Sequence, residues 1–132
     1  MRVLLTTLLV LVPLAASVQA RTPGDIPEVR NTLVAVAAGD MIRKECTTIS
    51  PRMLRVFNLR NQLLSTARAA GFSREQIDAY VDDKIEKDRL KGLARQYLAQ
   101  KGVDPDSPSS YCTVGKAEIA AKTPVGRLLK AK

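Results

Sequence analysis

The chain contains two cysteines, Cys46 and Cys112, and their wide separation limits the folds that it can adopt. A disulfide between them would close residues 46–112 into one long loop. In the chain-entropy model, this cross-link restricts the unfolded chain and stabilises the folded state by about 4 kcal/mol. The alternative, a metal-binding pair, has little support, because the sequence has no CxxC motif and no histidine. We therefore expect a Cys46–Cys112 disulfide if the protein matures in an oxidising compartment.

The first twenty residues indicate such a compartment. Met1 and Arg2 form a short positive start, residues 3–14 are almost wholly apolar, and small residues precede an expected cleavage site after Ala20. This is the pattern of a secretory signal peptide, and its apolar run is shorter than the roughly 20 residues that span a membrane. We expect a periplasmic or secreted protein that loses residues 1–20 and keeps no transmembrane segment. An uncleaved leader that serves as an anchor is the alternative.

Residues 21–132 have the length of a single domain. The formal net charge of the whole chain is +8 at pH 7. A basic exported protein meets anionic lipids, cell-wall polymers and acidic proteins. We therefore expect an envelope protein or an anionic envelope component as partner, with peripheral membrane contact as one form of this, and no nucleic acid. The same charge could equally serve only to keep the protein soluble.

The apolar residues recur at helical spacing, and no stretch alternates with the period of a strand. We expect a first helix over 27–45 and a second over 51–70, in which Ser50 is the N-cap and Pro51 the first helical residue. Gly71 would then end the second helix in a left-handed conformation.

A third helix is expected over 74–100, with a capping box of Ser73 and Gln76 at its start. The apolar stripes in its two halves are rotated by more than a quarter turn from each other. A straight amphipathic helix cannot bury both stripes on one partner, so we expect a bend near 88–92 or a change of packing partner there.

A fourth helix is expected over 110–122, and it carries Cys112. Residues 124–132 would form a short, basic, frayed end. The predicted fold class is therefore all-α, a small bundle of about four helices that one disulfide ties together. Gly115, on the same face as Cys112, would allow two helices to approach closely beside the disulfide.

The lack of histidine removes most catalytic signatures, including zinc-protease motifs and Ser-His-Asp or Cys-His arrangements. Glycine-rich nucleotide-binding loops are also missing, so we expect no enzyme activity, no cofactor and no metal site. The densest acidic group contains Asp82 and Glu86, which lie four residues apart and indicate a solvated helix face. An enzyme that uses carboxylates alone is the weakest alternative.

Five basic residues form the candidate partner-binding surface: Arg43, Lys44, Arg52, Arg55 and Arg60. The first two fall at the end of the first predicted helix, and the other three fall on the second. They could bind an anionic partner, or they could form the solvent side of an amphipathic helix.

Short motifs along the chain resemble those of a known family. They are Ile42-Arg43-Lys44 before Cys46, Ser50-Pro51-Arg52-Met53, Ala70-Gly71-Phe72-Ser73 with Ala79-Tyr80-Val81, Gly102-Val103-Asp104-Pro105-Asp106, Tyr111-Cys112 with Gly115 and Ala117-Glu118-Ile119, and Gly126-Arg127-Leu128-Leu129. Together they resemble a family of small exported alphaproteobacterial proteins, domain of unknown function 5333. The resemblance covers nearly all of the chain after residue 20. It implies a periplasmic location and brings no activity and no catalytic residues.

The leading hypothesis is a non-enzymatic exported helical protein that binds another envelope component. The first rival is a periplasmic chaperone-like or protective protein, which would expose apolar surface in a regulated way. The charge and the missing catalytic motifs favour the binding hypothesis, because a helical scaffold with a basic surface needs no further chemistry to bind an acidic partner.

Overall fold

The computed structural model describes residues 21–132, so the predicted signal peptide at 1–20 lies outside the described residues. The described elements, in chain order, are η1 (Pro23–Asp25), α1 (Pro27–Glu45), β1 (Ile49–Pro51), α2 (Met53–Ala69), α3 (Arg74–Asp82), α4 (Lys84–Gln100), α5 (Pro108–Ala121), η2 (Gly126–Leu128) and β2 (Leu129–Ala131). The all-α prediction is confirmed. The described part has five α-helices rather than about four, together with one small two-stranded sheet.

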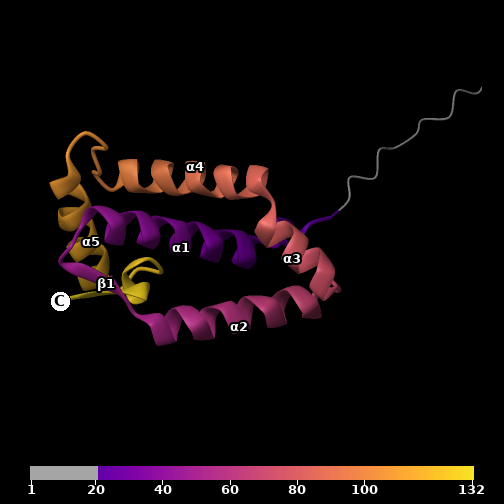
Figure 1. The fold of residues 1–132 in the computed structure, drawn as a ribbon. Coiled ribbons are helices and arrows are strands. Elements are labelled where there is room, and N and C mark those ends of the chain that lie inside the picture. The colour runs from indigo at the N-terminus through magenta and orange to yellow at the C-terminus, as the bar shows by residue number, and fades with distance from the viewer. Residues whose placement is uncertain (1–20) are drawn as a thin grey trace, which may run out of the picture.

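Helix α1 is the centre of the molecule. Figure 1 shows α4 along one side of α1 and α2 along the other, while α3 joins α2 to α4 at one end and α5 lies at the opposite end. Helix α1 packs closely against α4 and α5 but only loosely against α2. Helix α2 is therefore loosely attached, and its apolar residues Met53, Leu54 and Phe57 are exposed.

The main core lies at the α5 end of the molecule. Its buried members are Ala35, Ala38, Ile42, Cys46, Ile49, Ala94, Leu98, Val103, Val114, Val125 and Leu129. A second, smaller cluster of Ala67, Phe72 and Ile77 fills the corner between α2 and α3. Ala67 is the one fully buried residue of α2, which fits the loose attachment of that helix.

The predicted disulfide between Cys46 and Cys112 is present and ties the end of α1 to α5. Gly115 lies beside it, and a Cβ atom on this residue would come within 2.6 Å of the side chains of Ile42 and Ile49. The predicted close approach of two helices at Gly115 is therefore confirmed, because any larger residue would separate α5 from α1.

The start of the second helix differs from the prediction. Ser50 and Pro51 belong to β1, which pairs antiparallel with β2, and α2 begins at Met53. The Arg52 N–H donates to the carbonyl of Leu128 at 2.7 Å, which extends the contact between these segments. Strand pairing with a segment at the other end of the chain therefore overrides the local N-cap preference of Ser50.

The turn after α2 follows the prediction. Gly71 has a φ of +96°, and the Ser73–Gln76 capping box begins α3. The predicted bend near 88–92 is wrong, because α4 runs without a break through Gly92. The chain instead breaks at Asp83, which is extended and whose carboxylate accepts the N–H of Glu86 at 2.8 Å. The two stripes of the predicted third helix thus lie on two separate helices.

The last helix starts earlier than predicted, at Pro108, and ends at Ala121 before Lys122, whose φ is +53°. The frayed end predicted for 124–132 is wrong. Val125 and Leu129 are buried, and the Lys132 N–H donates to the carbonyl of Thr48 at 2.9 Å. These contacts make the C-terminal segment part of the core. None of the helices in residues 21–132 is long and apolar enough to cross a membrane.

Candidate functional site

Helix α1 has apolar residues on two opposite faces. At 100° per residue, Ala35, Ala38 and Ile42 share one face, and all three are buried in the main core. Leu33 and Val36 lie on the opposite face and are only partly buried. Apolar side chains on both faces gain from being covered, so the second apolar face of α1 is a candidate contact surface.

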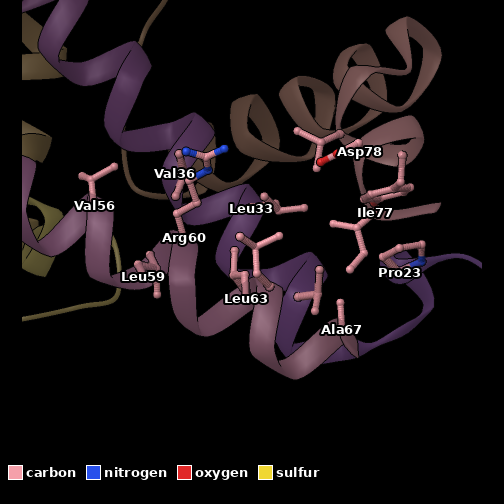
Figure 2. Close-up of a pocket in the computed structure, with 14 residues that line it drawn as sticks. Pro23, Leu33, Val36, Val56, Leu59, Arg60, Leu63, Ala67, Ile77 and Asp78 are labelled. Carbon is pink, nitrogen blue, oxygen red and sulfur yellow. The ribbon is translucent and has the colours of Figure 1, made fainter. Parts of the chain in front are cut away.

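The first hollow on this face lies between α1, α2 and α3 and has a volume of about 260 Å³. Figure 2 shows Leu33 from α1, Leu63 from α2 and Ile77 from α3 converging on it. Its charged lining residues are Arg60 and Asp78. The hollow is therefore an apolar space with few polar groups, as ligand sites usually are.

A second hollow, of about 600 Å³, lies between α1 and α4. Both hollows are lined by Leu33, Val36, Tyr80 and Val81, so they adjoin across these four side chains. We call the two hollows together the α1 trough. Its floor is the second apolar face of α1, and its walls come from α2 on one side and from α3 and α4 on the other.

Basic side chains line both sides of the trough. Arg60 lies on the α2 side, and Lys87, Lys91 and Arg95 lie on the α4 side. Within residues 21–132, neither Arg60 nor Arg95 forms an ion pair, and the ion pairs of Lys87 and Lys91 are 3.9 Å long and exposed. Such pairs contribute little, so these four cations remain available to a ligand.

The two acidic residues of the trough are already paired with cations. Asp40 contacts Arg43 at 2.5 Å and Lys44 at 2.6 Å, and Asp78 contacts Arg74 at 2.9 Å. Partial burial acts to raise the pKa of Asp40, but the two cations outweigh it and hold this pKa below its usual value. The trough is therefore cationic as well as apolar.

Exposed apolar side chains extend the trough along α2. Met53, Phe57, Arg60 and Leu64 follow the spacing of one helical stripe. Met53 is 67% exposed and Phe57 is 57% exposed. Val81 lines both hollows and is 48% exposed. Neighbouring apolar side chains exposed in this way are typical of an interaction surface.

The five basic residues of the predicted surface do not form one patch. Lys44 and Arg60 line the trough. Arg43 lines the adjoining surface near Met53, and the Arg52 side chain donates to the carbonyl of Leu129 at 2.9 Å. Arg52 therefore has a structural contact.

Arg55 lies on another side of α2. It is five residues from Arg60, which is a rotation of about 140° on a helix, and it lines a separate hollow with Arg127. Helix geometry therefore separates the two basic residues that the sequence interpretation grouped together.

The sequence interpretation missed the basic residues of α4. Lys87, Lys91 and Arg95 are spaced four residues apart, so they form one row on a helix. This spacing was a usable signal. The position of this row across the trough from Arg60 could not be inferred, because it depends on the packing of α2 and α4 on either side of α1.

A second cluster of polar residues surrounds Glu118, which is 3% exposed. Its carboxylate accepts hydrogen bonds from the hydroxyls of Tyr97 and Thr123, and the Lys101 amine lies 3.6 Å away. The Thr123 hydroxyl also accepts the N–H of Gly126 at 3.0 Å. The cluster joins α4, α5 and the C-terminal segment through these hydrogen bonds, so we interpret it as a structural network.

We expect stability to fall as the pH rises from about 10 to about 12, because of Tyr97. Burial and the hydrogen bond to Glu118 raise the pKa of Tyr97 to about 12 from an ordinary value of 10.0. Between these values the folded protein keeps a proton that the unfolded chain releases, so rising pH favours unfolding. Urea unfolding across this range measures the effect. Tyr97→Phe should show a shallower decline, and an identical decline in the two proteins would contradict the assignment.

No group of three or more cysteine, aspartate or glutamate residues in the described chain is arranged to hold a metal ion. The carboxylates of the densest acidic group form structural contacts. Asp78 pairs with Arg74, Asp83 caps α4, and Glu86 contacts Arg89 at 2.8 Å.

The described residues thus define a small helical domain with one disulfide and an apolar trough lined by cations on both sides. The chain belongs to the family of unknown function DUF5333, whose model matches residues 23–130. The membership of this family that the sequence motifs indicated is thereby confirmed. Searches of curated proteins and of solved structures each found no match.

Proposed function

We propose that this protein is a non-enzymatic binding protein of the cell envelope and that it holds its ligand in the α1 trough. The observation that carries the proposal is the second apolar face of α1, which α2 and α4 flank and cover only in part. Burial of apolar surface contributes about 25 cal/mol per Å², so a ligand that fills the two hollows would gain affinity directly.

The location in the envelope is supported by two features. The Cys46–Cys112 disulfide fits an oxidising compartment, and residues 1–20 have the composition of a signal peptide. The role as a binding protein rather than an enzyme is supported by Asp78, Asp83 and Glu86 of the densest acidic group, which serve as ion-pair partners and a helix cap.

A chaperone-like role is the second candidate, and the exposed residues Met53 and Phe57 favour it. A chaperone binds many unfolded chains through apolar surface, and its selectivity for charge is low. The α1 trough combines apolar surface with cations on both sides, which favours one class of ligand. The range of ligands captured at the trough therefore separates the two roles.

A photo-crosslinking side chain placed at position 81 in the exported protein tests the proposal. Val81 lines both hollows, whereas Ile85 is 78% exposed, apolar and close in sequence but lines neither of them. We expect a discrete adduct from position 81 in intact cells and none from position 85, which is the matched control. Equal adduct patterns at the two positions would overturn the trough as the binding site. Many adducts that increase under stress would favour the chaperone role.

A further inference from the structure

We infer that the ligand of the α1 trough is an amphipathic helix with acidic residues on both flanks of its apolar stripe, presented by a partner protein. This inference rests on the proposed function and adds the chemistry of the partner. It is carried by the arrangement of charge around the apolar floor, which has Arg60 on one side and Lys87, Lys91 and Arg95 on the other.

The length of the trough suits a helix. From Leu33 to Lys44, α1 rises roughly 17 Å, which is about three turns of a helix lying alongside it. A helix that binds in a groove uses apolar anchors at successive turns, as in other helix-in-groove complexes. Helices α2 and α4 already lie on either side of α1, so an added helix would cover the remaining apolar face.

The positions of the cations distinguish a helix from a lipid. A single anionic headgroup requires cations gathered at one end of an apolar channel. Here the cations flank the floor on both sides, and Lys87, Lys91 and Arg95 extend along more than two turns of α4. An acidic helix would meet a cation on each flank of its apolar stripe, so this arrangement favours the helix.

Two other occupants fit poorly on charge. A second copy of this chain would bring the basic residues of α2, including Arg55 and Arg60, toward a basic trough, and the whole chain has a net charge of +8. The leader at residues 1–20 has no acidic residue, and its one charged side chain is Arg2. Like charges opposed across an interface weaken binding, so neither occupant matches the trough.

The test uses the exported protein and a fluorescent synthetic peptide of about five turns. The peptide carries a leucine stripe at helical spacing with glutamate on both flanks, and a control peptide has lysine in place of every glutamate. We expect saturable binding of the acidic peptide and at least about tenfold weaker binding of the basic one. Binding of the acidic peptide should weaken further as salt is added.

Matched charge variants locate the binding. Lys87→Glu with Arg95→Glu should weaken binding of the acidic peptide by about tenfold or more. Lys116→Glu with Lys130→Glu makes the same change in net charge at two exposed residues that line neither hollow, and it should leave affinity within about twofold. Circular dichroism and urea unfolding of both double variants show whether the fold is retained.

Each alternative outcome contradicts the inference in a different way. Equal binding of both peptides would show that charge does not select the ligand. Binding to vesicles of phosphatidylglycerol in place of the peptide would assign the trough to anionic lipid. If position 81 yields a discrete adduct while the acidic peptide does not bind, the proposed function stands and the acidic helix is wrong.

Discussion

Replacing Cys46 and Cys112 together with alanine is expected to lower the free energy of unfolding by about 4 kcal/mol. The disulfide joins residues 66 apart, and in the chain-entropy model a loop of this length restricts the unfolded chain by that amount. A domain of this size has a total stability of about 5–15 kcal/mol, so the loss removes a large part of it. Urea unfolding of the variant and of the oxidised protein measures the difference.

The double replacement avoids a free buried thiol, which a single replacement would leave behind. Thr47→Ala is a suitable control, because Thr47 is exposed and lies beside Cys46. The control should unfold within about 0.5 kcal/mol of the parent. A loss below about 1 kcal/mol for the cysteine variant would mean that packing around Gly115 and Ile42 already holds α5 against α1.

Replacement of Glu118 with leucine should cost about 2–4 kcal/mol. The carboxylate is the shared acceptor for the hydroxyls of Tyr97 and Thr123 in a buried position. Leucine would leave the Tyr97 hydroxyl without an acceptor and the Thr123 hydroxyl with only the backbone carbonyl of residue 118, which lies 3.5 Å away. An unsatisfied buried group costs about 1–3 kcal/mol. The change should also increase hydrogen exchange at the Arg127 amide, which donates to the carbonyl of Thr123 at 2.9 Å.

Two further variants separate hydrogen bonding from packing at this position. Glu118→Gln keeps one acceptor oxygen and should lose less stability than Glu118→Leu. A combined variant with Tyr97→Phe, Glu118→Leu and Thr123→Val removes the donors together with the acceptor and should recover part of the loss. If the combined variant is less stable than Glu118→Leu by the sum of the separate effects of Tyr97→Phe and Thr123→Val, the three residues have no interaction energy with one another.

Local features of the fold were predictable from the sequence where neighbouring residues decide the conformation. The first helix has the expected bounds of 27–45, and the Ser73–Gln76 capping box follows a tight turn at Gly71. The break at Asp83 also had a local signal, an N-cap residue followed three residues later by Glu86.

Apart from the Cys46–Cys112 disulfide and the helix contact beside it at Gly115, features that depend on contacts between distant segments were not predictable. Ser50 and Pro51 have the local character of a helix start, but β1 pairs with β2 across most of the chain length. The C-terminal residues are basic and short, so the burial of Val125 and Leu129 against α1 and α5 has no local signal. Long-range pairing overrode local preference in both places.

The candidate site shows the same limit. Leu33 and Val36 follow a helical apolar pattern that the sequence cannot distinguish from an ordinary core face. Only the loose packing of α2 against α1 reveals that this face is partly uncovered. The row of Lys87, Lys91 and Arg95 was visible in the sequence, but its position across the trough from Arg60 was not.

Chemical-shift mapping of the isotope-labelled protein, with the partner captured from position 81 added, tests the central claim most directly. If the α1 trough is the binding site, the amide signals of residues 33–41 and 87–95 should change on binding, and those of residues 113–121 in α5 should stay unchanged. Changes centred on α5, or on the separate hollow that contains Arg55 and Arg127, would contradict the assignment of ligand binding to the trough.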